Sequence, residues 1–207
     1  MSPFNSRNFF RSPLSNQELS TIADHIRAGQ VGLFPTDTVY GLGALAENAA
    51  ATAAIYRMKN RPLERSLPVL IGSWEMFERY SGPIKKSYLT RIRKNWPGAL
   101  TVVVPAGEAA LSLSYHCLRE GTLAMRLPDH PSLRYLIEQV GSPLAATSAN
   151  LSGGKDPLSV ELVPGAIRDQ VNWAWSEPIS AGSAVPSSVI DLTGGKPEII
   201  REGAVKF

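Results

Sequence analysis

The 207-residue chain contains little cysteine and histidine, and this scarcity limits the chemistry that it can perform. Its one cysteine, Cys117, excludes an internal disulfide framework. The histidines show no zinc-binding spacing, because His25 lies in a predicted helix, His116 is adjacent to Cys117 and His130 precedes Pro131. We expect all three histidines to be structural or surface residues, with His130 at the start of a helix. We expect no metal site built from protein ligands.

The sequence also lacks the usual nucleotide-binding and hydrolase motifs. The segments SGGKD and TGGKP contain Gly-Gly-Lys, but they lack the earlier glycine and the following serine or threonine of a Walker loop. The segment GLGALA does not match the GxGxxG fingerprint, and no Gly-x-Ser-x-Gly sequence marks a serine hydrolase. Any nucleotide chemistry must therefore use a different set of residues.

No apolar run approaches the roughly 20 residues that span a bilayer. The first dozen residues, MSPFNSRNFFRS, lack the continuous apolar stretch of a secretion signal. We therefore expect a cytoplasmic protein with no membrane association. With 43% hydrophobic residues, the chain can bury one sizeable core. We expect a partly ordered N-terminal arm over residues 1–12 and a single domain over residues 13–207.

Acidic residues are missing from one strongly basic stretch. The formal net charge is only +3, yet no Asp or Glu occurs between Arg79 and Gly107. A basic helical stripe of this kind attracts a polyanion, such as tRNA or double-stranded RNA, through counterion release. An ordinary solvated helix face is the alternative that stays open. The candidate RNA-contacting residues are Lys85, Lys86, Arg91, Arg93 and Lys94.

Helical and strand patterns alternate along the chain and predict an α/β protein with no internal repeat. Ser15 and Glu18 form a capping box for the first helix, and Gly29 suits its end. Further helices are predicted at 48–59, 73–80, 84–94, 131–140 and 160–168, and strands at 31–35, 67–71, 99–105, 122–128, 143–146, 188–193 and 198–202. The 17 glycines and 16 prolines lie between these elements rather than in one linker, so no domain boundary is predicted.

Cationic residues at the ends of these elements form a first candidate site. Lys59 and Arg61 lie where Pro62 must end a helix, so both side chains leave an exposed helix end and can converge on one anion. Arg126 has apolar neighbours on both sides in AMRLP, so its buried guanidinium needs a carboxylate or phosphate partner. A substrate can supply that partner, and a structural ion pair with one of the 18 acidic residues is the alternative.

Hydroxyl and amide side chains end a predicted strand in PLAATSAN. Thr147, Ser148 and Asn150 would lie there beside free backbone amides, a setting that suits polar contacts to a phosphate or a nucleobase. A serine or asparagine turn at the strand end is the alternative. Taken alone, none of these groups identifies a function.

Seven segments, taken in order, resemble the YrdC-type family of L-threonylcarbamoyladenylate synthases. They are FPTDTVYGLG, KNRP, WPGALTVVVP, AMRLPDHP, PLAATSANLSG, PSSVIDLT and IIREG. The resemblance runs from Gln17 to Gly203, and the chain is similar to the short, single-domain bacterial form of the family. It implies an α/β fold in which an open, twisted mixed β-sheet with flanking helices surrounds a large concave cavity. One departure is Arg65-Ser66-Leu67, where family members often have Lys-Pro-Leu or Asn-Pro-Leu.

The resemblance also implies a reaction. ATP, L-threonine and bicarbonate would give threonylcarbamoyl-AMP and pyrophosphate, for N6-threonylcarbamoyladenosine modification of tRNA next to the anticodon. A threonylcarbamoyl transferase complex would be the downstream partner. We expect Mg²⁺ as the cofactor, held mainly by the ATP phosphates and water, because no carboxylate cluster is visible in the sequence.

Residues are assigned by matching the family's motifs. Lys59 and Arg61 match a Lys-x-Arg pair that would clamp the triphosphate and serve as the catalytic residues, since positioning and charge neutralisation supply most of the catalysis in phosphoryl chemistry. The further residues implied to bind ATP are Ser148, Asn150 and Arg201. The residues implied to bind L-threonine are Thr36, Arg126 and Ser187, with Arg126 suited to the threonine carboxylate.

Two alternatives belong to other classes. A non-catalytic tRNA-binding or double-stranded RNA-binding module of the same fold would bind RNA with a steep salt dependence and without ATP. A paralogue of the same fold would carry out different carbamoyl or nucleotide chemistry. The presence of both the Lys-x-Arg and the Ser-Ala-Asn sets favours the synthase.

Overall fold

The computed structural model describes residues 8–179 and 185–207. Within these residues, one sheet contains eleven strands. The strands are β1 (Phe9–Arg11), β2 (Gly32–Phe34), β3 (Gly41–Leu45), β4 (Val69–Leu70), β5 (Leu100–Pro105), β6 (Leu118–Arg119), β7 (Thr122–Arg126), β8 (Leu144–Ser148), β9 (Trp173–Ser176), β10 (Ser188–Asp191) and β11 (Glu198–Arg201).

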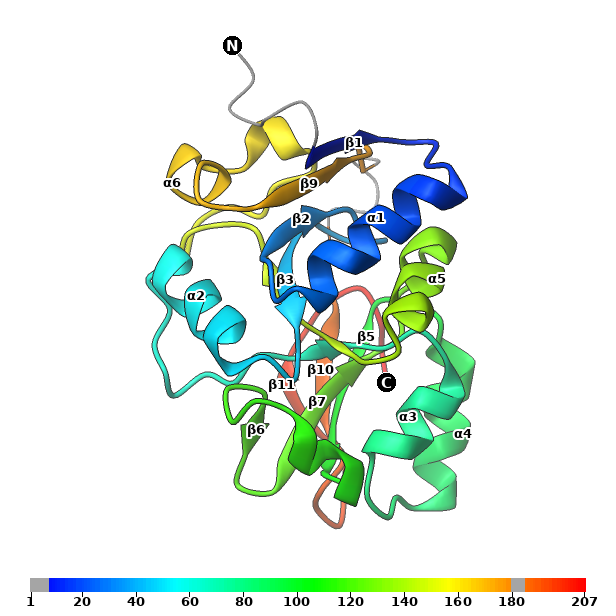
Figure 1. Cartoon of the computed structure of the whole chain (residues 1–207). Helices are drawn as coiled ribbons and strands as arrows, with labels where there is room; N and C mark the ends of the chain where they lie inside the picture. Colours follow the sequence, from blue (N-terminus) through cyan, green and yellow to red (C-terminus); the bar gives the residue numbers. More distant parts are fainter. Residues whose placement is uncertain (1–7, 180–184) are drawn as a thin grey trace.

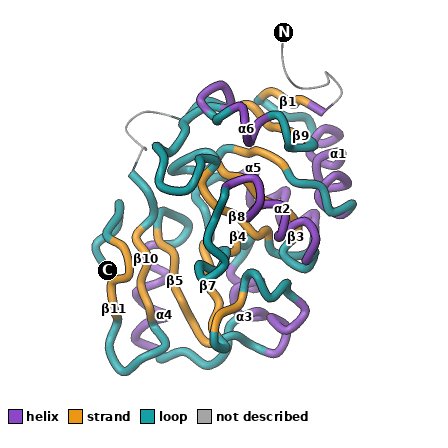
Figure 2. Tube along the Cα trace, turned by 90° about the vertical axis from the view of Figure 1, so that its left-hand side faces the viewer, coloured by secondary structure: helices purple, strands orange, loops and turns teal. Residues whose placement is uncertain are grey.

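The sheet is mixed, and its spatial order departs far from the chain order. The strands follow the order β1-β9-β2-β3-β8-β4-β7-β5-β10-β11, with β6 added beside β7. Strand pairs such as β4–β7 and β5–β10 are parallel, whereas β3–β8 and β5–β7 are antiparallel. Figure 2 shows β11, β10, β5 and β7 following one another across the sheet. The predicted single-domain α/β fold with an open mixed sheet is confirmed.

Helices flank this sheet. They are α1 (Asn16–Arg27), α2 (Ala49–Lys59), α3 (Trp74–Tyr80), α4 (Lys86–Asn95), α5 (Pro131–Val140) and α6 (Gly165–Arg168), with 3₁₀ turns at Glu108–Ser112 and Val160–Leu162. Figure 1 shows α1 and α5 side by side, with α3 and α4 grouped at the lower right of the view and α2 at its left. No helix among the described residues is both long enough and apolar enough to cross a bilayer.

The sequence signals for helix ends agree with the observed ends. The Ser15 side chain accepts from the backbone N–H of Glu18, and the Glu18 carboxylate accepts from the backbone N–H of Ser15, which confirms the capping box. The prediction of one helix over residues 160–168 was wrong, because Pro164 separates the 3₁₀ turn from α6. Strand β1 lies within the predicted arm, of which residues 1–7 lie outside the described residues.

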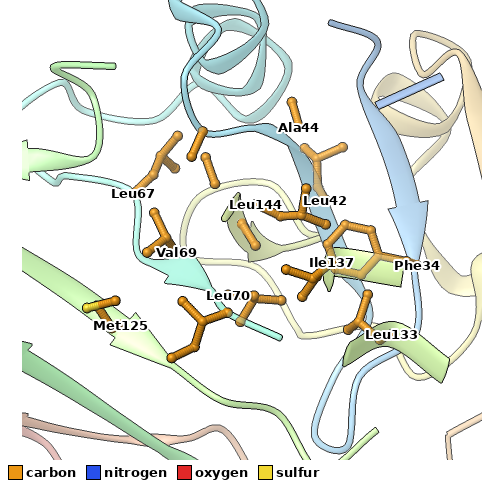
Figure 3. Close-up of a cluster of buried hydrophobic side chains, with 14 of the residues drawn as sticks. Phe34, Leu42, Ala44, Leu67, Val69, Leu70, Met125, Leu133, Ile137 and Leu144 are labelled. Atoms are coloured by element: carbon orange, nitrogen blue, oxygen red, sulfur yellow. The ribbon is translucent and has the colours of Figure 1, made fainter. Parts of the chain in front are cut away.

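The hydrophobic core lies between the central strands and the helices that cover them. Figure 3 shows Phe34, Leu42 and Leu144 from the sheet packed near Leu133 and Ile137 of α5. The same core extends along β4, whose two residues are buried, and along β7 through Leu123 and Met125, which are fully buried. At one position the packing requires glycine, because a Cβ on Gly32 would lie 2.0 Å from the Trp173 indole. The sheet is thus a rigid support for the loops at its strand ends.

Candidate functional site

Lys59, the last residue of α2, is surrounded by oxygen atoms from the end of β8 and the segment that follows it. Asn60 ends the helix in a left-handed conformation, with φ 50° and ψ 47°, which asparagine adopts more readily than most residues. The Lys59 ammonium group donates to the carbonyl oxygens of Ser148 and Asn150 and, at 2.9 Å, to Asn150 Oδ1. The side chains of Ser148 and Asn150 are also joined, since Ser148 Oγ donates to Asn150 Oδ1 at 2.7 Å.

The expectation that Lys59 lies at an exposed helix end was wrong. Lys59 is only 2% exposed, because the segment after β8 closes over its ammonium group. Burial is the main cause that lowers the pKa of Lys59 to about 8; the charge of Arg61 lowers it further and the charge of Asp156 opposes the shift. All three ammonium protons already have an oxygen acceptor, so ATP would have to replace one of these oxygens to contact Lys59.

Arg61 holds the loop that departs from the family pattern. Its Nε donates to the carbonyl oxygen of Arg65 at 3.1 Å, and its Nη2 donates to that of Ser66 at 2.9 Å. The next residue, Leu67, is fully buried and its N–H donates to the carbonyl oxygen of His116. Arg61 itself is half-buried, and burial lowers its pKa. The Arg65-Ser66-Leu67 loop is therefore compatible with an ordered Arg61 side chain.

Arg126 ends β7 and forms a buried ion pair. Its Nη2 lies 2.6 Å from Asp37 Oδ1, its Nη1 donates to Thr38 Oγ1 at 2.8 Å, and its Nε donates to the Gly98 carbonyl oxygen at 3.1 Å. Burial lowers the pKa of Arg126, and the charge of Asp37 opposes this shift. The alternative of a structural ion pair is thus present in the structure, although two of the five guanidinium N–H groups stay available to a ligand.

Thr36 belongs to the same turn as Asp37. Its hydroxyl accepts from the backbone N–H groups of Thr38 and Val39 and donates to the Val39 carbonyl oxygen at 2.7 Å. At the end of this turn the Tyr40 carbonyl oxygen accepts from the Ala149 N–H, next to Ser148. The turn that carries Thr36 and the segment that carries Ser148 therefore lie beside each other.

Ser187 and Arg201 are in direct contact. Arg201 Nη2 lies 3.0 Å from Ser187 Oγ and 2.7 Å from the Ser187 carbonyl oxygen, and the hydroxyl also lies 2.9 Å from Thr101 Oγ1. Burial lowers the pKa of Arg201, the charge of Asp156 raises it, and the charge of Arg126 lowers it. Since Asp156 also acts on Lys59, one acidic residue lies within electrostatic range of both Lys59 and Arg201.

Three polar residues of this region were missed by the sequence reasoning. Asp37 and Thr38 hold Arg126, and Asp156 acts on two of the candidate cations. A signal for Asp37 was available, because it is the only acidic residue between Asp24 and Glu47. An isolated carboxylate in an apolar stretch predicts a buried ion pair or a site. No comparable signal marked Asp156, which follows a glycine-rich turn.

The basic residues at α4 do not form one stripe. All five are exposed, as predicted for a surface, and the buried face of the helix is Tyr88 and Ile92. Lys86 and Arg93, seven residues apart, share one direction, because α-helices have 3.6 residues per turn, whereas Arg91 and Lys94 point in another. Three of the five also have contacts within the chain: Lys85 donates to the Gly195 carbonyl oxygen, Arg91 lies over Phe207 and Arg93 lies over Trp74.

The histidines have structural surroundings. His130 Nδ1 accepts from the Leu133 N–H at the start of α5, as predicted. His116 is buried, with Nδ1 3.0 Å from Thr52 Oγ1 and 3.1 Å from Ser114 Oγ, and His25 Nδ1 lies 2.7 Å from Gln30 Oε1. Among residues 8–179 and 185–207, no group of three or more His, Cys, Asp or Glu is arranged to hold a metal ion.

Two cavities open elsewhere on the surface. One, of about 520 Å³, lies between α2 and the 115–120 segment, and its lining includes Tyr56, Ser66 and Tyr115. The other, of about 390 Å³, lies beside the start of α3 and is lined by Trp74, Trp96 and other residues. Neither cavity is lined by the residues predicted to bind ATP or L-threonine.

The family model that matches this chain is Sua5/YciO/YrdC, described as telomere recombination, and it covers residues 24–203. The chain belongs to this family. It is 36% identical over 195 residues to the threonylcarbamoyl-AMP synthase of Bacillus subtilis strain 168, which covers 92% of this chain and 55% of the relative. It is 34% identical over 185 residues to the Pseudoalteromonas translucida threonylcarbamoyl-AMP synthase, with 86% and 96% covered. The chain thus spans little more than half of the first relative.

Solved structures give the same result for the fold. The P. abyssi Sua5 structure complexed with L-threonine has a TM-score of 0.86 and 32% identity, and the match covers 95% of this chain and 57% of that one. The E. coli YciO structure has a TM-score of 0.84 and 25% identity, with 96% of both chains covered. These similarities confirm the predicted family and fold, whereas the role of each site residue stays a prediction.

Proposed function

We propose that this protein is an L-threonylcarbamoyladenylate synthase, which forms threonylcarbamoyl-AMP and pyrophosphate from ATP, L-threonine and bicarbonate. The observation that carries the proposal is the contact between Arg201 and Ser187. The first residue is assigned to ATP and the second to L-threonine. A threonine derivative can be joined to AMP only where the two sites meet, because the reacting atoms must lie within about 3.5 Å of each other. The similarity to curated synthases supports the same conclusion.

The reaction requires two bond-forming steps. The threonine amine attacks the carbon of bicarbonate and water is lost, which gives a carbamate. A carbamate oxygen then attacks the α-phosphorus of ATP, and pyrophosphate leaves. The protein's contribution is to hold the substrates in line and to neutralise charge on the phosphates.

The residues of this chain suit these tasks. Arg126 would bind the threonine carboxylate with its free N–H groups, beside Thr36 and Ser187. Lys59 and Arg61 would exchange their present carbonyl acceptors for phosphate oxygens of ATP, next to Ser148 and Asn150. Arg201, at the border, would contact the nucleotide. This exchange replaces neutral acceptors with charged ones, which strengthens each hydrogen bond.

Mg²⁺ would enter with the nucleotide. The candidate site presents mostly cationic, hydroxyl and amide groups, so phosphate oxygens and water are the ligands that suit this ion best. When bound, Mg²⁺ neutralises charge on the phosphates of ATP. Lys59, Arg61 and Arg201 share this task from the protein side.

The product would serve tRNA modification in the cytoplasm through a separate threonylcarbamoyl transferase complex. The tRNA-binding alternative assigns no role to the polar contacts that hold Arg126 and Arg201, whereas the synthase uses both residues. The structure of a relative with L-threonine supports threonine as the amino acid.

The test is incubation of the purified protein with ATP, L-threonine, bicarbonate and Mg²⁺. We expect threonylcarbamoyl-AMP by mass spectrometry and an equal amount of pyrophosphate. L-Valine replaces the threonine hydroxyl by a methyl group and should react more slowly, because an unpaired polar group in the site costs about 1–3 kcal/mol. Equal rates with valine, or synthesis without bicarbonate, would contradict the proposal. RNA binding without any ATP turnover would favour the alternative module.

A further inference from the structure

The ion pair between Arg126 and Asp37 lies at the edge of the core rather than inside it. The side chains of Arg126 and Asp37 keep 8% and 14% of their surface exposed. A buried ion pair is seldom retained for stability alone, because the cost of removing both charges from water often equals or exceeds their attraction. A pair that is nearly dry but still reachable fits a ligand-binding role better than a purely structural one.

Each partner of the ion pair has unused hydrogen-bonding groups. Arg126 uses three of its five N–H groups, on Gly98, Thr38 and Asp37. Asp37 uses Oδ1 for Arg126, and no described residue donates to its Oδ2. The pair therefore offers N–H donors and a carboxylate acceptor on two side chains that touch, with Nη2 2.6 Å from Oδ1.

His130, whose imidazole is within electrostatic range of Asp37, does not occupy this acceptor. The charge of Asp37 acts to raise the pKa of His130, although burial lowers that pKa overall. The ring nitrogens of His130 face other groups, since Nδ1 accepts from the Leu133 N–H and Nε2 lies 3.5 Å from Glu177 Oε1. Asp37 Oδ2 is thus left for a ligand.

We propose that Asp37 and Arg126 together recognise the zwitterion of an α-amino acid, with Asp37 as the residue that selects for the ammonium group. The ammonium and carboxylate groups of an amino acid are joined through one carbon atom, so their spacing matches that of the paired side chains. The two ligand charges complement the two protein charges, and the bound complex carries no net charge. The identity of this amino acid as L-threonine rests on the proposed function.

Asp37 thereby determines specificity, because it distinguishes an amino acid from a carboxylate that lacks the amine. The hydroxy isostere should bind more weakly, since it offers Asp37 Oδ2 an uncharged hydroxyl donor in place of the ammonium group. Thr38 has a different task. Its hydroxyl accepts from Arg126 Nη1 at 2.8 Å and lies 3.2 Å from Thr36 Oγ1, so it positions the guanidinium and carries no charge that could select for the ammonium group.

The experiment compares two ligands by calorimetry, L-threonine and its 2-hydroxy isostere 2,3-dihydroxybutanoate, on three proteins. The wild type should bind threonine about tenfold more tightly or better. Asp37→Asn, which keeps an oxygen acceptor for Arg126, should bind the two ligands with nearly equal affinity. The matched control Thr38→Val should weaken both ligands by the same factor and keep the preference. Thermal melting and ATP affinity are recorded for each protein.

Two results would overturn the inference: a preference for threonine that persists in Asp37→Asn, or a wild type that binds both ligands equally. The second result decides the question even if Asp37→Asn does not fold. The proposed function fails separately. If the wild type binds another α-amino acid in place of threonine, and Asp37→Asn loses the preference over its hydroxy isostere, the zwitterion site stands and the threonine assignment fails.

Discussion

The cations of the candidate site and the cations of α4 differ in what surrounds them. Lys59 and Arg126 are 2% and 6% exposed and are surrounded by protein oxygens. Lys94 and Arg93 of α4 are exposed, and Arg93 contacts the Trp74 ring and, at 3.7 Å, the exposed Glu78 carboxylate. Five cations lie on α4 and its N-cap and four in the candidate site, yet the buried cations of the site have the more closely packed hydrogen-bond partners. Arg126, a single cation with apolar neighbours on both sides in the sequence, is therefore a better guide to a site than the run of charge at α4.

Arg126→Met gives the largest expected effect. Removal of one partner leaves the Asp37 carboxylate without its counter-ion, which should lower the free energy of unfolding by about 3–5 kcal/mol. Threonine binding should be lost in the fraction that stays folded. Urea unfolding and calorimetry measure the two effects.

Arg57→Met is the matched control for Arg126. Arg57 is exposed in the last turn of α2, two residues before Lys59. Its substitution should change the free energy of unfolding by no more than about 0.5 kcal/mol. Similar losses of unfolding free energy in Arg126→Met and Arg57→Met would show that burial does not distinguish the cations of the site from the exposed cations.

Lys59→Met should give the second-largest loss of stability. The ammonium group satisfies the Ser148 carbonyl oxygen and two oxygens of Asn150, so its removal should cost about 1–3 kcal/mol of unfolding free energy. Synthesis should fall with it, because the segment after β8 loses its anchor. The measurements are urea unfolding and pyrophosphate release, with Lys94→Met as the matched exposed control. A fully stable Lys59→Met protein would contradict the importance of this oxygen cage.

The comparison of the two groups of cations also shows which features of the site can be predicted from the sequence. The end of α2 at Lys59 and the start of α1 at Ser15 could be predicted, because both depend on a few neighbouring residues. The contacts of Lys59 with Ser148 and of Arg126 with Asp37 could not, since each joins residues 89 positions apart. Those contacts depend on a strand order in which β3 lies beside β8 and β4 beside β7. Local patterns do not specify this order.

Lys59 should also titrate apart from the six other lysines of the chain. Burial lowers its pKa to about 8, against an ordinary value near 10.5. Between these pH values the unfolded chain holds more protons than the folded one, so this residue's contribution to the free energy of unfolding rises with pH.

The check is ¹³C NMR of labelled lysine side chains across pH 7–11. One signal should titrate near pH 8 and be missing from Lys59→Met. The difference in unfolding free energy between wild type and this variant should grow over the same range. Seven lysine signals that all titrate together would contradict the separation between inner and outer cations.

The α4 cations should give the smallest effect on synthesis, and the structure sharpens the test for RNA. Because Lys86 and Arg93 point one way and Arg91 and Lys94 another, one RNA backbone can follow only one of these pairs. We expect one double variant, Lys86→Gln with Arg93→Gln or Arg91→Gln with Lys94→Gln, to lower the salt-dependence slope of tRNA binding by about 1.8, from about 0.9 for each lost phosphate contact. The other double variant should leave this slope unchanged, as filter binding across a salt series would show.

Threonylcarbamoyl-AMP formation without RNA should persist in both double variants. Equal slopes in all three proteins would make α4 a solvated helix face, and lost synthesis in a folded variant would place α4 in the active site.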